Sequence, residues 1–101
     1  MTDYYLSTAE YIGENHSKYL KNTTIYDARI KARGMLDKYG KPIRVSKIIN
    51  KGTDSEYLGT VRRWAYAYDR YGVDHSEDWA CWIDKDEREY ALLYNGKIRR
   101  N

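Results

Sequence analysis

Apolar residues recur every three or four positions between residues 24 and 39, which is the spacing of one face of an α-helix. Thr24 and Asp27 form a T-x-x-D capping pattern at the start of this segment. Gly40, followed at once by a lysine and Pro42, is a clear stop signal. The pattern therefore predicts one helix over about 24–39. Its apolar stripe consists of Ile25, Ala28, Ala32, Met35, Leu36 and Tyr39.

After Pro42 the period of the apolar residues changes to two. Ile43, Val45 and Ile49 alternate with polar residues until the turn-rich stretch NKGTDSE. This alternation predicts a strand, and residues 57–68 are its expected hairpin partner. At the start of the chain, DYYLSTAEYI is predicted as a strand, and GENHSKYLKN as a loop that leads into the helix.

The C-terminal region contains the strongest short hairpin signal. EYALLY and KIRR flank Asn95 and Gly96, a pair that is typical of a type I′ turn. Residues 76–83 fit either a strand or a short helix opened by Ser76, and the strand is favoured. The charged stretch DKDERE between these segments is predicted to be a solvated turn.

These elements predict a fold of the α+β class in the order β-α-β-β-β-β. A single helix (about 24–39) cannot cover both faces of a sheet, so we expect it on one face of an antiparallel sheet of four to five strands. The chain has 101 residues, which the usual size of domains assigns to a single domain, 1–101.

The composition shows how the core is filled. The chain has 12 Tyr and 3 Trp but no Phe, so some tyrosines must be buried, with a partner for each hydroxyl. Cys81 is the single cysteine and is predicted to be a small buried hydrophobe. There is no run of about 18 apolar residues and no secretory signal pattern, so we expect a cytoplasmic protein without a membrane partner.

The net charge is only +3, but it is unevenly distributed. Residues 18–63 hold twelve bases against four acids, and residues 69–89 hold eight acids against three bases. These segments form complementary faces within one fold, or they present a basic face and an acidic face to different partners. Pairing within the fold is the more ordinary of these two interpretations.

The stretch VRRWAYAYDRYG (61–72) is the richest in side chains suited to recognition. In a regular strand, every second residue from Arg62 to Arg70 points to one face. The rings of Trp64, Tyr66 and Tyr68 either fill the core beneath the helix or lie exposed between arginines. The first arrangement is favoured, because in the second the alanines of this strand would face the alanines of the helix and leave voids. The candidate macromolecule-binding residues are Arg44, Lys47, Arg62, Arg63, Trp64, Tyr66, Tyr68 and Arg70.

RRWAYAY, residues 62–68, is similar to the RNP1 strand of RNA recognition motifs. Arg63 stands where that motif has a glycine, and Asp69 stands at its last aromatic position. The resemblance implies that bases stack on Trp64, Tyr66 and Tyr68 while nearby arginines contact phosphates. A single-stranded RNA- or DNA-binding module is therefore the alternative function.

The sequence indicates no catalytic residues, no cofactor and no metal site. His16 and His75 fall in predicted loops without a paired nucleophile. One cysteine and two separated histidines do not make a zinc pattern, and neither an EF-hand loop nor a glycine-rich phosphate loop is present.

We therefore expect a non-enzymatic binding protein that docks on another macromolecule, most often a protein, because Tyr, Trp and Arg dominate protein interfaces. In its short length and its many Tyr and Lys residues the chain resembles accessory proteins of phages and prophages, including inhibitors of host systems. A homodimer, formed by an exposed final strand or an uncovered aromatic row, and a monomer are equally open.

Overall fold

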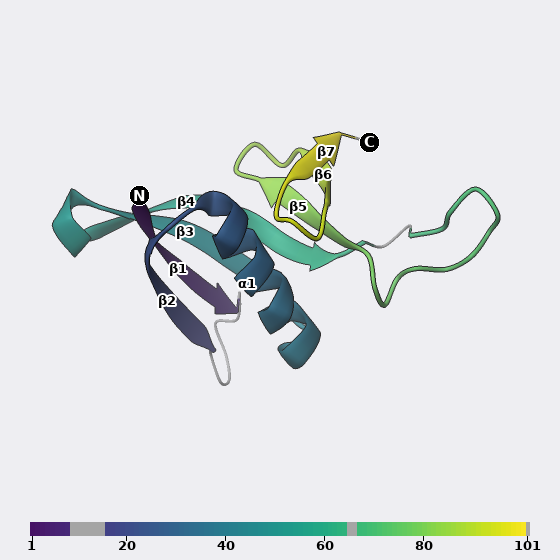
Figure 1. Cartoon of the computed structure of the whole chain (residues 1–101), viewed down its shortest axis with the longest axis horizontal. Helices are drawn as coiled ribbons and strands as arrows, with labels where there is room; N and C mark the ends of the chain where they lie inside the picture. Colours follow the sequence, from purple (N-terminus) through teal and green to yellow (C-terminus); the bar gives the residue numbers. More distant parts are fainter. Residues whose placement is uncertain (9–15, 65–66, 101) are drawn as a thin grey trace.

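The computed structural model describes residues 1–8, 16–64 and 67–100, and in this part of the chain one helix packs on a seven-stranded antiparallel sheet (Figure 1). The sheet order is β2-β1-β3-β4-β5-β6-β7. In chain order the elements are β1 (Thr2–Thr8), β2 (Ser17–Thr23), α1 (Ile25–Tyr39), β3 (Ile43–Ile49), a 3-10 turn (Asn50–Gly52), β4 (Asp54–Arg63), β5 (Ala80–Asp84), β6 (Glu89–Leu92) and β7 (Ile98–Arg100).

The predicted α+β class and the helix on one face of the sheet are confirmed, but four to five strands in the order β-α-β-β-β-β is wrong. The predicted loop before the helix contains strand β2. In this edge strand only Leu20 is buried, so the sequence shows no alternation of apolar and polar residues. Residues 76–83 enter a strand at Ala80, not a helix.

Local capping fixes both ends of α1, as the sequence predicts. The Thr24 side chain accepts a hydrogen bond from the Asp27 N–H at 3.2 Å. At the other end Gly40 has a φ of 67°, a left-handed conformation that favours glycine, and its N–H donates to the Leu36 carbonyl at 2.8 Å. Among the described residues, no helix is long and apolar enough to cross a membrane.

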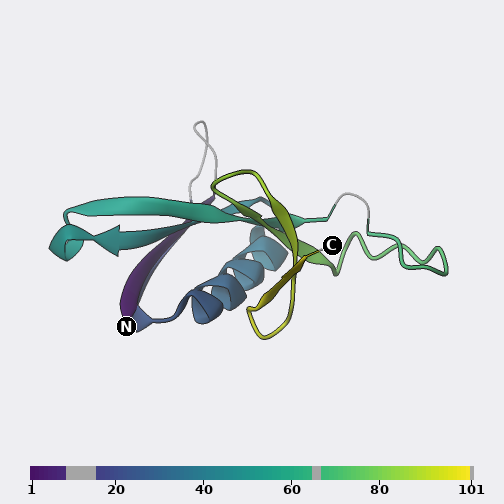
Figure 2. The same cartoon turned by 90° about the horizontal axis from the view of Figure 1, so that it is seen from above.

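The core lies between α1 and the concave face of the sheet. Ala28 and Ala32 are completely buried, and their small side chains let the helix lie close to Ile43, Val45 and Val61. Figure 2 shows the sheet curving around the helix, with β1 on one side and the β6–β7 hairpin on the other. This curvature lets a single helix cover strands from both ends of the sheet.

Trp82 fills the core beneath the helix and depends on a glycine in the neighbouring strand. A Cβ atom on Gly59 would lie 2.5 Å from both the Trp82 ring and the Ile83 carbonyl oxygen. The Arg29 guanidinium lies 4.6 Å from the centre of the indole ring. The indole is therefore enclosed between the bare backbone of β4 at Gly59 and the Arg29 cation of the helix.

The predicted hairpin at Asn95 and Gly96 is confirmed, but its type I′ turn is wrong. Only Gly96 has a positive φ, 83°, and its N–H donates to the Leu93 carbonyl at 3.0 Å. This is a type I turn followed by a left-handed residue, the usual three-residue hairpin loop. A side chain on Gly96 would collide with the Tyr26 backbone, so the turn packs directly on the start of α1.

We predict that Gly59→Ala lowers the free energy of unfolding by about 1–3 kcal/mol, because the new methyl group overpacks the site beside Trp82. Gly34→Ala is the matched control. Gly34 lies in the exposed interior of α1 with no atom within 4 Å of the place that a methyl group would take, so alanine should raise the stability by about 0.5–1 kcal/mol. Urea unfolding measures both; equal effects of the two substitutions would contradict the packing at Gly59.

Candidate functional site

Trp64 and Tyr68 of the predicted aromatic row do not fill the core beneath the helix, since Trp64 lies beyond the end of β4 and Tyr68 is exposed. Strand β4 ends at Arg63, so residues 57–68 are not one regular strand. Val61 is completely buried in the core and Arg63 bonds to Asp37 of α1, which turns this face of β4 toward the helix and leaves Arg62 exposed on the other face. The favoured arrangement is wrong because Trp82 of the next strand already occupies the space under the helix.

The structure places the candidate residues in separate regions. Arg62 pairs with Glu89 at 3.5 Å, and Arg44 lies over the Tyr57 ring at 4.2 Å. Lys47 lies opposite Tyr4 in the β1–β3 pair. Trp64 follows the end of β4, Tyr68 and Arg70 lie further along the connection to β5, and Tyr66 lies outside the described residues. These residues therefore do not form one continuous row.

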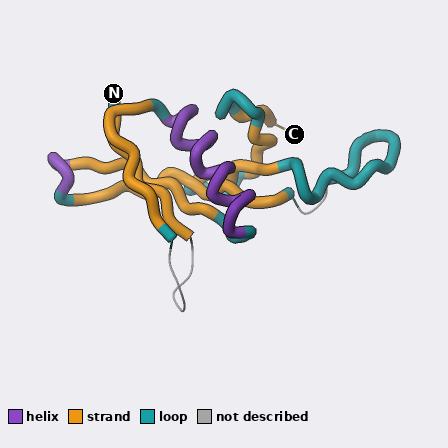
Figure 3. Tube along the Cα trace, turned by 60° about the horizontal axis from the view of Figure 1, so that its bottom comes forward, coloured by secondary structure: helices purple, strands orange, loops and turns teal. Residues whose placement is uncertain are grey.

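Residues 67–78, which we call the arm, project from the body of the protein (Figures 1 and 3). At its tip the Asp69 N–H donates to the Val73 carbonyl at 3.0 Å. The Asp69 carboxylate accepts hydrogen bonds from the N–H groups of Tyr71, at 2.9 Å, and Val73, at 3.0 Å. Even so, Tyr68 is 61% exposed, Tyr71 77% and Val73 52%. The arm thus holds its backbone in place while it presents apolar side chains to solvent.

His75 closes the arm near its base. Its Nε2 lies 3.0 Å from Asp69 and its Nδ1 lies 3.4 Å from Asp78. The imidazole also stacks on Trp79, with ring centres 4.1 Å apart and planes 4° from parallel. Because both ring nitrogens are engaged and one face is covered, the geometry is that of a structural lock, not of a free general base.

Ionisation strengthens this lock. The hydrogen bond to Asp69 raises the pKa of His75, and the contact with Asp78 adds to the rise. The bond from His75 and the N–H of Val73 lower the pKa of Asp69. The imidazolium–carboxylate pair is therefore the favoured state between these two shifted values.

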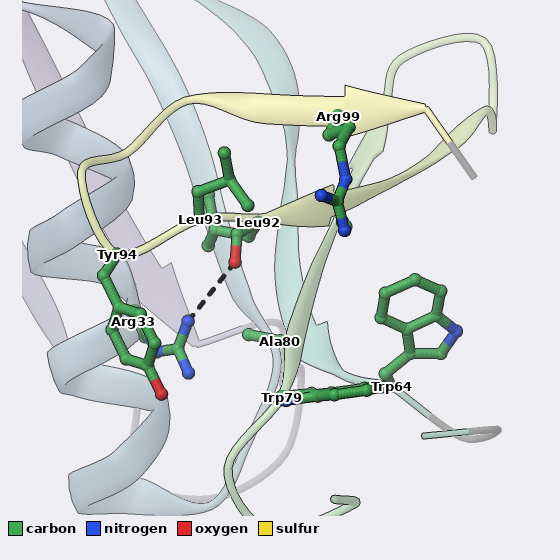
Figure 4. A pocket seen from close by; sticks show the side chains of 9 residues that line it. Arg33, Trp64, Trp79, Ala80, Leu92, Leu93, Tyr94 and Arg99 are labelled. Carbon is green, nitrogen blue, oxygen red and sulfur yellow. Dashed lines mark hydrogen bonds between the residues drawn. The ribbon is translucent and has the colours of Figure 1, made fainter. Parts of the chain in front are cut away.

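A cavity of about 380 Å³, which we call the base pocket, lies between α1, the β6–β7 hairpin and the two tryptophans that flank the arm (Figure 4). Ala80, Ala91 and Leu92 contribute apolar surface to it. The other lining residues are Arg33, Trp64, Trp79, Leu93, Tyr94 and Arg99.

Arg33 holds the parts of the base pocket together. Its guanidinium donates to the Leu92 carbonyl, at 3.4 Å, and to the carbonyl of Asp78. The same group lies 4.3 Å from the centre of the Tyr94 ring. One side chain of α1 thus joins the helix to the hairpin and to the end of the arm.

The face of the sheet opposite the helix, which we call the open face, carries tyrosines in register across several strands. Tyr19 of β2 pairs with Tyr5 of β1, Tyr5 pairs with Ser46 of β3, and Ser46 pairs with Tyr57 of β4. Tyr5 is 40% and Tyr19 52% exposed. This row contains flat aromatic surface beside the cation of Arg44.

The single cysteine is inaccessible, and the described part of the chain holds no cluster of metal-ligating side chains. Cys81 is completely buried, as predicted, and burial raises the pKa of its thiol. No group of three or more His, Cys, Asp or Glu side chains lies together there in a way that would hold a metal ion.

Sequence reasoning missed Trp79, Tyr94, Arg33 and Arg99 as neighbours of Trp64. They come from four separate elements or connections, so no local spacing links them. The His75–Asp69 pair had one usable signal. That signal is the glycine at position 72, which stands in its turn as Gly96 stands in the loop before β7. In both turns the glycine N–H donates to the carbonyl three residues earlier, and such a turn brings the residues on its two sides together.

We predict that the NMR titration midpoint of His75 lies above the ordinary value of about 6.5 and falls toward it in Asp69→Asn. Because the pKa of His75 is raised in the folded state, this pair stabilises the arm fully from about pH 6.5 down to the acidic range in which Asp69 takes up a proton, and the stabilisation is lost as the pH rises through the raised pKa of His75. Amide exchange protection in the arm should decrease over that range. Asp74→Asn is the control, since Asp74 bonds to the Ser76 backbone; an equal shift in both variants would contradict the assignment.

No protein-family model matches this chain, and neither a curated protein nor a solved structure matches it. The arm, the base pocket and the open face are therefore the physical basis for assigning a function.

Proposed function

We propose that this protein acts without catalysis, by docking on another protein through its arm. The observation that carries the proposal is the exposure of Tyr68, Tyr71 and Val73 on a segment whose backbone is held by its own hydrogen bonds. Aromatic side chains at the centre of an interface supply much of its binding energy. A role of this kind is typical of small accessory or regulatory proteins, including phage inhibitors of host systems.

The charge of the arm supports a protein partner at this place. The arm contains four acids against one arginine, and it stays net acidic when His75 is protonated, so its field repels phosphate groups. The acids are Asp69, Asp74, Glu77 and Asp78, and the base is Arg70. A protein surface that offers an apolar depression surrounded by basic side chains would complement the arm in both shape and charge.

Order within the arm also supports binding. Segments that become ordered only on binding lose part of their interaction energy to conformational entropy. The contacts of Asp69 with the turn and with His75 fix the arm before any partner arrives. Binding by this arm would therefore require less reorganisation than binding by a free loop.

The arm proposal is tested by placing a photo-crosslinking amino acid at Tyr71 in the native host, and at Tyr26 as the control. Tyr26 is an exposed tyrosine in the first turn of α1, where its backbone packs against the Gly96 turn. We expect one protein species to be cross-linked from position 71 and not from position 26. Tyr71→Ser should then weaken the purified complex about tenfold or more, the loss expected for a central aromatic contact.

Two results would contradict arm docking. The first is the same cross-linked species from both positions, and the second is the absence of any species from position 71. A cross-link to a second copy of the chain would show self-association instead, and sedimentation velocity of the purified protein would confirm it.

A second candidate function, binding of single-stranded nucleic acid, is favoured by the open face. Tyr5 and Tyr19 are exposed side by side in register, and Arg44 stacks on Tyr57 in the same row. Aromatic faces with adjacent cations are suited to stacked bases and their phosphates. In this proposal the bases stack on the tyrosines of the open face and not on Trp64 and Tyr68. Of the predicted macromolecule-binding residues it keeps Arg44.

We predict for this second function that a labelled oligonucleotide binds at low salt and dissociates steeply as the salt rises, because condensed counterions are released on binding. Tyr5→Ala should weaken binding about fivefold or more, as expected for the loss of one stacked base. Tyr26→Ala on the helix is the matched control and should leave the affinity unchanged. No binding at low salt, or equal losses in both variants, would exclude the open face as a nucleic-acid site.

A further inference from the structure

The base pocket has the size and composition of a small-molecule site. Its volume of about 380 Å³ falls within the range of about 300–1,000 Å³ that is typical of ligand pockets. Such pockets combine apolar walls with a few polar groups that orient the ligand. Here Leu92 and two alanines supply apolar surface, while Arg33 and Arg99 supply two guanidinium groups.

Two indoles give the pocket an aromatic wall. The ring centres of Trp64 and Trp79 are 6.2 Å apart and their planes are inclined by 50°, so the two indoles touch as a tilted aromatic pair. His75 covers one face of Trp79, and Figure 4 shows this indole edge-on at the bottom of the pocket with Trp64 rising beside it. A flat ring placed on the other face of Trp79 would meet Trp64 at its edge.

The pocket is cationic, in contrast to the acidic arm beside it. None of its lining residues is acidic. The Arg33 guanidinium is bonded to two backbone carbonyls, whereas the Arg99 side chain makes no hydrogen bond or ion pair within the described residues. Figure 4 shows the Arg99 guanidinium turned toward the space between Leu92 and Trp64. Arg99 thus places a cation beside an aromatic wall, with no partner in the described part of the chain.

We propose that the base pocket binds a small aromatic acid, that is, a planar ring carrying one anionic group. The ring stacks on the face of Trp79 that His75 leaves open, with its edge against Trp64, and the anionic group accepts hydrogen bonds from the Arg99 guanidinium. A guanidinium pairs with either a carboxylate or a phosphate through two parallel hydrogen bonds. The shared chemistry is therefore an aromatic carboxylate or an aromatic nucleotide, and the inference does not depend on docking by the arm.

The test uses indole-3-acetate and adenosine 5′-monophosphate as probes, with indole-3-acetamide and adenosine as their uncharged counterparts. NMR follows the indole N–H signals of the full chain. We expect at least one acid to shift the signals of Trp64 and Trp79 while that of Trp82, buried under the helix, stays in place. A response to the carboxylate alone or to the phosphate alone identifies which anion the site accepts.

A matched pair of variants isolates the proposed cation. Arg99→Gln should weaken binding of the acid about tenfold, the loss expected for a charge-assisted pair, and leave the uncharged counterpart unaffected. Arg100→Gln removes the same charge from the next residue of β7, which does not line the pocket, and should change the affinity less than about twofold. The proposal is overturned if neither acid shifts Trp64 and Trp79 at millimolar concentration, or if the two variants weaken binding equally.

Discussion

One helix must bury a whole face of a sheet that, in the described residues, has seven strands, and this constraint organises the molecule. Alanines at the centre of the apolar stripe let α1 approach the central strands closely, and the sheet then curves so that its ends also reach the helix. The helix covers one face only. The opposite face, the tip of the β3–β4 hairpin and the arm extend beyond it, whereas the base pocket is lined in part by Arg33 of the helix.

Elements set by contacts close in sequence were predictable. The helix begins and ends where Thr24 and Gly40 satisfy its terminal backbone groups, and both signals involve neighbours within four residues. Strand β3 and the final hairpin likewise follow from alternation and from a turn glycine. Strand β2 was not predictable, because an edge strand with one buried residue has no apolar period and depends on pairing with β1.

The orientation of β4 shows why the aromatic row was misplaced. A register shift opposite Val45 and Ser46 puts both Tyr57 and Thr60 on the open face, although they are three residues apart. Counting every second residue along the sequence therefore gives the wrong face of the sheet on one side of this irregularity. What fixes the inward face is long-range packing of Val61 against Trp82, together with the ion pair between Arg63 and the helix.

The aromatic surplus and the uneven charge were nonetheless useful guides to the candidate surfaces. Arg62 and Glu89 pair across strands, so part of the charge asymmetry is neutralised inside the fold. The acids of the arm and the cations around the base pocket remain close neighbours of opposite sign. The sequence contained all of these residues, but only the folded chain brings Trp64 next to Trp79 and Arg99.

Arg33 gives this arrangement a thermodynamic consequence. Because one guanidinium holds both the Asp78 carbonyl at the end of the arm and the Leu92 carbonyl beside the cavity, a displacement of the arm also displaces a wall of the cavity. A partner that displaced the arm would therefore alter the affinity of the cavity for its ligand, and linkage would require the factor to be the same in both directions. A partner on the arm and a small molecule in the cavity would thus act as effectors of each other.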